Sequence, residues 1–283
     1  MNSIYRVTGH KFNFLGAQLC NAVEAIEGFS PFHIDEGEEA LFSFVEGAAV
    51  PKMERALYEF THEGVTGTFG RTAKGFLLTL KLQGEEAIEL WHDEGEKEVL
   101  IHGNNSTALY RFALWMGLGL MMAPYDTVAI HSSCIVYQGK AVLFLGESGT
   151  GKSTHTRLWQ EHIEGTTLLN DDSPFLRVED GKVWAYGSPW SGKTPCYKQE
   201  RYEVAACVRL SQAPYNKIQK LPILQAYGAI HPSCPPTFAY DNALYDHISR
   251  FISHLLSTVP VYHLACLPDR EAALLSFNTI FTH

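Results

Sequence analysis

Apolar and polar residues alternate with a period of about two over parts of the first hundred residues. The alternation runs through residues 76–82, 87–91 and 98–102, and glycines separate these runs. Strands that bury one face have this period, and glycine favours the turns between them. The pattern predicts a β-rich N-terminal region over residues 1–104, arranged as a meander of antiparallel strands.

From residue 105 onward, helical and strand patterns are mixed. The apolar run at 108–123 predicts a helix that extends to about Met122, with Asn105 and Ser106 as capping residues before it and Pro124 at its end. Apolar runs and turn residues predict the later elements: strands at 128–137, 141–145 and 167–170, a hairpin at 175–186, a strand at 204–210, a helix at 239–257, a strand at 261–264 and a helix at 269–277. Residues 105–283 are therefore predicted to form an α/β domain.

A glycine-rich segment lies between the strand at 141–145 and a helix with apolar residues at helical spacing. It matches the phosphate-loop pattern G-x-x-x-x-G-K-[ST] in full, and strand, loop and helix follow in the order that this motif requires. The alternative is a glycine-rich turn that matches by chance. The residues expected to contact a nucleotide are Gly146, Glu147, Ser148, Gly149, Thr150, Gly151, Lys152, Ser153 and Thr154.

The residue types of this segment suit phosphate chemistry. Glycines let successive backbone N–H groups point at phosphate oxygens, and the positive end of the following helix dipole adds to that field. Lys152 is expected to reach the β- and γ-phosphates, and Ser153 offers a hydroxyl to Mg²⁺. We expect ATP and Mg²⁺ as cofactors, although ADP or pyrophosphate as donor stays open.

Two acidic residues follow the strand predicted at 167–170. Asp171 and Asp172 come nineteen and twenty residues after Lys152, and in an open parallel sheet the strand ends line the same crevice as the loop. Phosphoryl transfer needs a carboxylate for Mg²⁺ and a group that orients or deprotonates the nucleophile. Because adjacent strand residues point in opposite directions, we expect different roles for the two aspartates. The alternative is a turn-forming pair at the surface.

Two further segments supply candidates. His131 lies in the strand before the loop strand, where a lone histidine is also typical of a hydrogen-bonded core residue. Residues 188–193 read Ser-Pro-Trp-Ser-Gly-Lys after a strand, and this composition suits either a substrate contact or a structural turn. The candidates for substrate contact are Trp190, Ser191 and Lys193.

Composition limits the partners and the compartment. The 283 residues include 22 basic and 31 acidic ones, and the net charge of −9 argues against nonspecific binding to nucleic acid or a membrane surface. The six cysteines lack metal-ligand spacing, which is typical of reduced thiols. The N-terminus lacks a signal-peptide layout, and the apolar run at 108–123 is too short for a bilayer. We expect a soluble, cytoplasmic protein.

Together these residues resemble a known family. His131 fifteen residues before the first loop glycine, the loop itself and a strand ending in Asp171-Asp172 resemble the catalytic domain of bacterial HPr kinase/phosphorylase, in the superfamily of phosphoenolpyruvate carboxykinases. The resemblance covers about residues 127–195 and is closer to HPr-kinase-like proteins of unassigned substrate. It implies a mixed-sheet P-loop core of the HPr-kinase/carboxykinase type. It also implies Asp171 as general base, Asp172 as a metal or water ligand with Ser153 at the metal, and His131 beside the transferred phosphate.

The chain also departs from that family. HPr kinases carry glutamate where this chain has Thr154, their Asp-Asp pair lies two residues closer to the lysine, and their glycine-arginine-glycine signature has no counterpart here. These differences argue against HPr itself as the substrate. The chain is also too short for a carboxykinase, so decarboxylation is not expected.

The leading hypothesis is an ATP-dependent, Mg²⁺-requiring kinase that phosphorylates a hydroxyl group of an unidentified small molecule or peptide. In it, Lys152 and the loop amides neutralise the charge that develops in phosphoryl transfer. The alternatives are a nucleotide-binding regulatory protein, an ATPase without a phosphoacceptor, and a phosphorylase that runs the transfer in reverse. Whether the N-terminal region recognises the substrate or mediates assembly into a homo-oligomer stays open.

Overall fold

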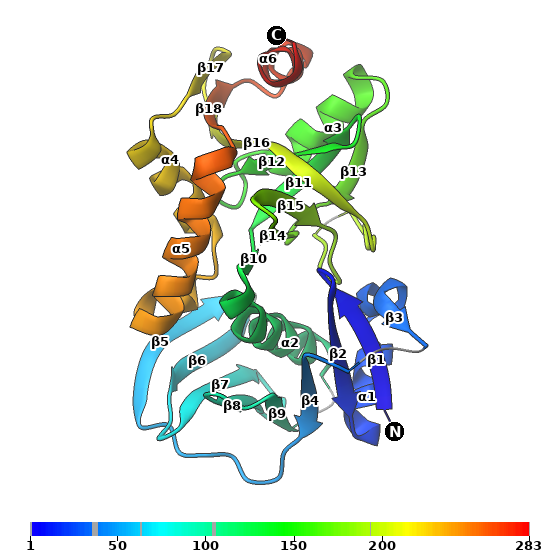
Figure 1. Cartoon of the computed structure of the whole chain (residues 1–283), viewed down its shortest axis with the longest axis vertical. Coiled ribbons are helices and arrows are strands. Elements are labelled where there is room, and N and C mark those ends of the chain that lie inside the picture. The colour runs from blue at the N-terminus through cyan, green and yellow to red at the C-terminus, as the bar shows by residue number, and fades with distance from the viewer. Residues whose placement is uncertain (1, 36–38, 63, 104–105, 193, 283) are drawn as a thin grey trace. The chain divides into compact units, whose positions relative to one another are not determined.

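The computed structural model describes residues 2–35, 39–62, 64–103, 106–192 and 194–282 (Figure 1). These residues form two compact units. Unit 1 comprises Met1–Pro124 and Thr237–Tyr245, and unit 2 comprises Tyr125–Pro236 and Asp246–His283. Each unit contains one mixed sheet with helices, so the prediction of an α/β protein with mixed sheets is confirmed at this level.

Unit 1 is built on a sheet with the strand order β3-β1-β2-β4-β9-β8-β7-β6-β5. The strands are β1 Asn2–Val7, β2 His10–Leu15, β3 His33–Ile34, β4 Phe42–Glu46, β5 Arg55–His62, β6 Val65–Arg71, β7 Gly75–Leu82, β8 Ile88–Asp93 and β9 Glu98–Gly103. From β5 to β9 each strand pairs antiparallel with the next, which confirms the predicted meander. The strand β4 instead pairs parallel with both β2 and β9.

Aromatic side chains and one long helix fill the core of unit 1. The strands curve around helix α2 (Thr107–Met122), and the short helix α1 (Ala17–Glu24) lies near the N-terminal strands (Figure 1). Phe12 stacks on Phe42 with ring centroids 5.2 Å apart, and Phe14 stacks on Phe44 at 5.1 Å. A Cβ at Gly117 of α2 would lie 2.6 Å from the Phe44 ring, so glycine here lets the helix approach the sheet closely.

Helix α2 falls on the other side of the predicted boundary. The sequence placed the boundary at residue 104, whereas unit 1 continues through α2 to Pro124 because the apolar residues of this helix are buried in the core of unit 1. The capping prediction is wrong for Ser106, whose side chain makes no capping hydrogen bond, and Asn105 lies outside the described residues. Burial rather than a polar cap therefore stabilises the start of the helix.

A segment from late in the chain completes unit 1. Arg71 on β6 donates two hydrogen bonds to the Asp241 carboxylate, at 2.7 and 2.9 Å. Tyr240 stacks on Tyr58 of β5 with ring centroids 4.6 Å apart. Asp241 also accepts hydrogen bonds from the backbone N–H groups of Ala243 and Leu244, at the start of helix α5 (Asn242–Thr258). The contact between Arg71 and Asp241 joins residues 170 positions apart in the sequence.

Unit 2 is built on a second mixed sheet, with the order β10-β14-β15-β16-β12-β11-β13, and with β18 on β16 and β17 on β18. The strands are β10 Thr127–Ala129, β11 Ser132–Tyr137, β12 Lys140–Leu145, β13 Thr167–Asn170, β14 Phe175–Glu179, β15 Lys182–Tyr186, β16 Arg201–Gln212, β17 Lys217–Lys220 and β18 Val261–Cys266. The helices are α3 Lys152–His162, α4 Ile223–Ile230, α6 Arg270–Phe281 and most of α5. The predicted hairpin is confirmed, with Asp180 and Gly181 at φ values of 50° and 72° in a two-residue turn.

The strand predicted at 128–137 is wrong as a single element. It divides into β10, which pairs with β14, and β11, which pairs with β12 and β13. Between them, the backbone N–H of Ile130 donates to the Pro174 carbonyl, and that of His131 donates to the Ser233 carbonyl. Each half-strand therefore follows a different neighbour, which a continuous apolar run in the sequence does not reveal.

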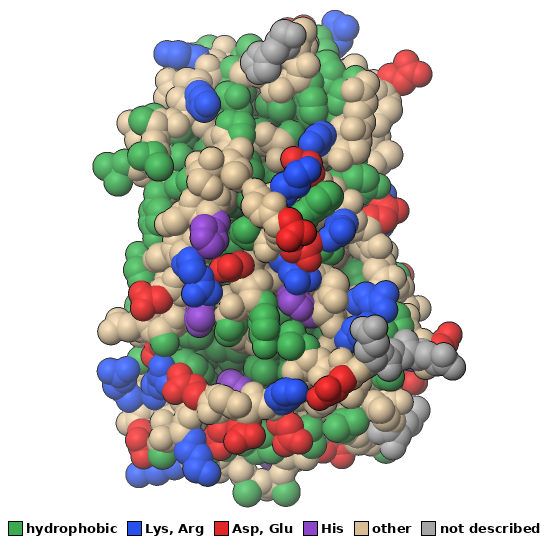
Figure 2. Space-filling model, in the orientation of Figure 1, with side chains coloured by type: hydrophobic (Ala, Val, Ile, Leu, Met, Phe, Trp, Pro, Cys, Tyr) green, Lys and Arg blue, Asp and Glu red, His purple; other side chains and the backbone are tan. Residues whose placement is uncertain are grey.

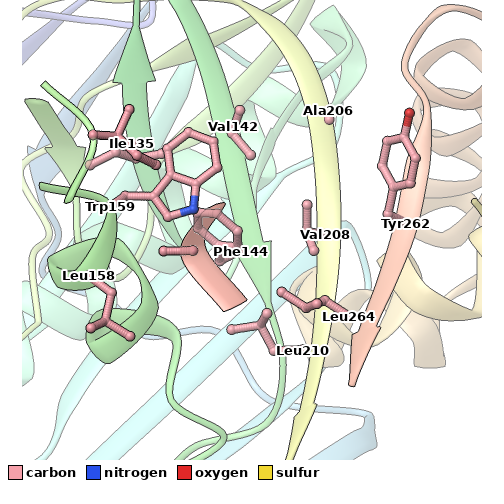
Figure 3. Packing of buried hydrophobic residues seen from close by; sticks show 12 residues of the cluster. Ile135, Val142, Phe144, Leu158, Trp159, Ala206, Val208, Leu210, Tyr262 and Leu264 are labelled. Atoms are coloured by element: carbon pink, nitrogen blue, oxygen red, sulfur yellow. The ribbon is translucent and has the colours of Figure 1, made fainter. Parts of the chain in front are cut away.

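One face of the unit 2 sheet carries the core under helices α3 and α6 (Figure 3). Trp159 of α3 is fully buried, its ring lies 5.5 Å from that of Phe144 on β12, and its indole N–H donates to Ser276 Oγ on α6 at 2.9 Å. The neighbouring His155 is also buried, with Nε2 3.0 Å from the same Ser276 oxygen. One hydroxyl thus joins two side chains of α3 to α6.

Charged side chains of both signs lie on the surface of the molecule (Figure 2). On the face drawn in Figure 2, basic and acidic side chains lie interspersed, with hydrophobic side chains between them. Within the described ranges, no helix is long and apolar enough to cross a membrane.

Candidate functional site

The glycine-rich loop lies at the carboxyl end of strand β12. Gly149 and Gly151 have φ values of 81° and 104°, which favour glycine. A Cβ placed at either position would meet no heavy atom within 4 Å, so this part of the loop borders open space. Gly151 occupies the N-cap position of α3 and has no side chain to cap the first N–H groups. These amide groups, at the positive end of the helix dipole, suit an anion.

Gly146 is required for a different reason. Its φ is 155°, and a Cβ here would lie 2.4 Å from Thr150 Oγ1. Thr150 folds the loop on itself, because its N–H and its hydroxyl both donate to the Glu147 carbonyl, at 3.2 and 2.8 Å. Ser148 lines the cavity described below, and Ser153 and Thr154 belong to the first turn of α3.

Lys152 turns its ammonium group back over the loop. Nζ lies 2.8 Å from the Gly146 carbonyl oxygen, 3.1 Å from that of Glu147 and 3.0 Å from His131 Nε2. Burial lowers the pKa of Lys152, although the carboxylates of Asp172 and Glu147 act in the opposite direction. The ammonium group therefore contacts two backbone carbonyl oxygens and one imidazole nitrogen.

Sheet topology brings the aspartate pair to the same edge. From the sequence we expected the strand ends to line one crevice, as they do in an open parallel sheet; in the structure β11 lies between β12 and β13 and is antiparallel to both. Strands β12 and β13 consequently run in the same direction, and their carboxyl ends flank the start of β11. The loop that follows Leu145, the residue His131 and the pair after Asn170 therefore meet at one edge of the sheet.

His131 connects the lysine to one of the aspartates. It lies in the break between β10 and β11, and its side chain is about half exposed. Nε2 lies 3.0 Å from Lys152 Nζ, and Nδ1 lies 3.5 Å from Asp172 Oδ1. When Lys152 donates to Nε2, the ring proton occupies Nδ1 and faces the carboxylate. Lys152, His131 and Asp172 thus form a continuous chain of polar groups.

Asp171 lies in a different environment from Asp172. Asp171 is 6% exposed, whereas the Asp172 side chain is 38% exposed. Oδ1 of Asp171 accepts a hydrogen bond from Ser133 at 2.7 Å, and Ser133 Oγ lies 3.0 Å from Thr156 Oγ1 on α3. Oδ2 is buried and has no hydrogen-bond partner among the described residues. A buried carboxylate oxygen without a partner is costly, so this atom suits a cation.

The segment after β15 makes hydrogen bonds to the turn at residues 170–173, which carries the aspartate pair. Asn170 donates from Nδ2 to the Trp190 carbonyl at 2.7 Å, while its Oδ1 accepts from the N–H groups of Asp172 and Ser173. Ser188 Oγ donates to the Ser173 carbonyl at 2.7 Å. One buried amide therefore fixes both the turn and the segment that packs on it.

This arrangement bears on the three substrate candidates of that segment. Trp190 and Ser191 are 4% and 7% exposed. The Trp190 ring lies 6.1 Å from that of Phe175, and the Ser191 hydroxyl donates to the Thr194 carbonyl at 2.6 Å. Lys193 lies outside the described residues. The contacts of Trp190 and Ser191 are those of the structural turn that the sequence offered as the alternative.

Several residues of the site were not predicted from the sequence. Asn170 directly precedes the aspartates, and asparagine before a turn was the one local signal. Ser133, Thr156 and Arg209 give no such signal. Arg209 forms an ion pair with Glu147 and lies beside the loop because β16 pairs parallel with β12, in a register that places it opposite Leu145.

A cavity of about 470 Å³ opens beside the loop. Loop residues 147–150 form one wall, and residues 209–212 of β16 with His263 of β18 form the other. We call it the loop-edge cavity. Lys152 and the aspartate pair do not line it, so it lies next to the polar chain described above rather than within it.

Comparison with known proteins gives a likeness to solved structures. No protein-family model and no curated protein sequence matches the chain. Among solved structures, the Hpr(Ser) kinase/phosphatase from Coxiella burnetii aligns with 15% identity and a TM-score of 0.31, over 54% of this chain and 92% of that chain. A likeness of this size establishes neither family nor activity, so the functional argument rests on the geometry of the site.

Proposed function

We propose that this chain is an ATP-dependent phosphotransferase with an HPr-kinase-like P-loop core, acting on a hydroxyl group of a small molecule or peptide. The observation that carries the proposal is the meeting of the glycine loop, Lys152, His131 and the aspartate pair at one sheet edge. A loop alone would suit any phosphate ligand. The adjacent carboxylates add the groups that phosphoryl transfer needs.

The residues fit a nucleotide with Mg²⁺. The open faces of Gly149 and Gly151 and the uncapped start of α3 leave backbone N–H groups for phosphate oxygens. The described residues hold no cluster of three or more His, Cys, Asp or Glu side chains for a metal. This agrees with Mg²⁺, which proteins commonly hold with one or two carboxylates plus substrate phosphates. Ser153 and an aspartate of the pair would hold the ion, which neutralises phosphate charge when bound.

The aspartates divide the remaining tasks. The resemblance assigns the base to Asp171 and the metal to Asp172, but a general base must come within hydrogen-bond reach of its substrate. The greater exposure of Asp172 and its contact with His131 support Asp172 as the group that orients the incoming hydroxyl. The unpartnered oxygen of Asp171, whose carboxylate is linked through Ser133 to Thr156 of α3, supports Asp171 as the metal-side carboxylate.

Lys152→Ala tests the proposal directly. Loss of a charge-assisted contact to phosphate is expected to weaken ATP binding at least about tenfold and to lower transfer by about 10²-fold or more. Binding is measured by calorimetry with ATP and Mg²⁺, and transfer by γ-labelled phosphate on a panel of hydroxyl compounds and peptides. Lys140→Ala, a partly exposed lysine at the other end of β12, is the matched control. Unchanged ATP affinity in Lys152→Ala contradicts the proposal.

Asp171→Asn and Asp172→Asn separate transfer from the alternatives. If Asp172 is the base, Asp172→Asn keeps ATP affinity within a few fold and loses transfer. Asp171→Asn is expected to lose the Mg²⁺ dependence of binding instead. The reverse result restores the assignment that the resemblance implies. Release of labelled inorganic phosphate without any labelled acceptor identifies an ATPase, and binding without release identifies a regulatory protein.

A further inference from the structure

The loop-edge cavity has no part in the phosphoryl transfer proposed above. Strands β12, β16 and β18 are adjacent and parallel, and ligands of α/β sheets bind at the carboxyl ends of such strands. Because Leu145 at the end of β12 pairs with Arg209, the last residues of β16 extend past β12 alongside the loop. The cavity lies in the angle between this extension and loop residues 147–150.

The cavity takes residues from both faces of the sheet, because the lining residues Leu210 and Gln212 alternate along β16 with Arg209 and Ser211. Leu210 and Leu264 belong to the core beneath α3 and α6 (Figure 3). Since strand residues alternate between faces, Arg209, Ser211 and His263 lie on the other face. Their polar groups therefore border the cavity without disturbing the core.

The lining combines apolar surface with several polar side chains, and its charges are paired. The Arg209 guanidinium is paired with the Glu147 carboxylate, so the cavity offers no free cation for a further phosphate group. The other polar side chains hydrogen-bond to one another or to the loop: Ser211 Oγ lies 2.9 Å from His263 Nε2, and Gln212 Nε2 donates to the Gly149 carbonyl at 3.1 Å. Hydroxyl, amide and imidazole groups match the hydroxyls of a sugar and the edge of a base.

We propose that the loop-edge cavity binds the nucleoside part, ribose and base, of a nucleotide whose phosphates occupy the loop. The proposal rests on the proposed function in one respect, namely that the loop binds phosphates. The cavity volume of about 470 Å³ lies within the range of small-molecule sites. Binding of a nucleoside in this cavity would mean that the phosphate donor is a nucleotide and not pyrophosphate.

Binding of ATP and of inorganic tripolyphosphate, each with Mg²⁺, tests the proposal on the full chain. Tripolyphosphate has the phosphates without the nucleoside. The variants Ser211→Ala and His263→Ala each remove one polar group of the cavity that does not contact the loop, and are expected to weaken ATP binding about three- to tenfold while leaving tripolyphosphate binding unchanged. Gln160→Ala, an exposed glutamine on α3 away from the cavity, is the matched control.

The outcomes separate this proposal from the proposed function. Unchanged tripolyphosphate affinity shows that a variant is folded with an intact loop. Wild-type protein that binds tripolyphosphate as tightly as ATP, or cavity variants that weaken neither ligand or weaken both equally, overturns the nucleoside assignment and leaves the phosphate loop standing. Wild-type protein that binds neither ligand overturns the proposed function and this proposal together.

Discussion

At the scale of single residues, burial determines what each titratable group does. Lys152, Asp171 and His155 lie within one region of unit 2, yet only the first two lie at the sheet edge where the glycine loop begins. Asp171 keeps an unpartnered oxygen in the interior, which suits a ligand. His155 is buried between Phe144 and Ser276, and its role is to pack α3 against the sheet and α6.

His155 predicts a pH dependence of stability. Burial lowers the pKa of His155 from 6.5 to about 4 in the folded chain. The folded state thus holds the neutral ring, and its stability is complete above pH 6.5 and falls as the pH drops towards 4, because the unfolded chain takes up the proton first. The free energy of unfolding is expected to fall by about 2 kcal/mol between pH 7 and pH 5 from this residue alone.

Urea unfolding at both pH values measures the effect. His155→Gln is the comparison, since glutamine does not titrate and can still reach a hydrogen-bond partner. The pH dependence of the wild type should exceed that of the variant by the stated amount. Equal slopes for the two proteins would show that His155 is exposed to solvent or protonated in the folded chain.

At the scale of elements, the turn after β13 depends on a segment far along the sequence. Residues 188–190 hold the turn through Asn170 and Ser188, and Gly192 lies so close that a Cβ there would come within 2.6 Å of the Asp171 carbonyl. The segment that suggested a substrate contact is therefore part of the scaffold that positions the aspartates.

Asn170→Ala tests this element. The variant removes the hydrogen bond from Asn170 Nδ2 to the Trp190 carbonyl and the two that its Oδ1 accepts from the Asp172 and Ser173 amides, so we expect a loss of about 2 kcal/mol or more in the free energy of unfolding. Under the proposed function, kcat should fall while ATP affinity changes little, because the loop does not contact Asn170. Asn170→Asp keeps the acceptor and should recover part of the kcat. A variant with a normal kcat per folded molecule would show that the turn is held without this amide.

At the scale of the whole molecule, the order of residues along the chain does not match the order of its units. Thr237–Tyr245 returns to unit 1 after the chain has built most of unit 2. The return is secured by Arg71 and Asp241, whose carboxylate is only 5% exposed. A buried ion pair is costly to break from one side, because the remaining charge has no partner.

Arg71→Met is therefore expected to lower the free energy of unfolding by about 3 kcal/mol. Adding Asp241→Asn removes the unpaired charge and keeps an oxygen for the start of α5, so the double variant should recover part of the loss. Lys74→Met, an exposed residue near Asp93, is the control and should change stability little. Denaturant unfolding measures all three. The account would be contradicted if the double variant lost more free energy of unfolding than the two single variants lose together.

The sequence by itself determined the local features: the antiparallel strands of residues 75–103, the hairpin at Asp180-Gly181, and the order strand, glycine loop and helix at 140–162. These depend on side-chain period and on φ preferences, which neighbouring residues specify. Only the tertiary structure decided the break at Ile130-His131, the place of α2 in unit 1 and the presence of Arg209 beside the loop. Each of these follows from pairing or packing between distant segments, which leaves no pattern at short range. The candidate residues Lys152, Asp171 and Asp172 could therefore be named from the sequence. The residues that contact them or hold the aspartate turn, Asn170, Ser133 and Thr156, were identified only from the tertiary structure.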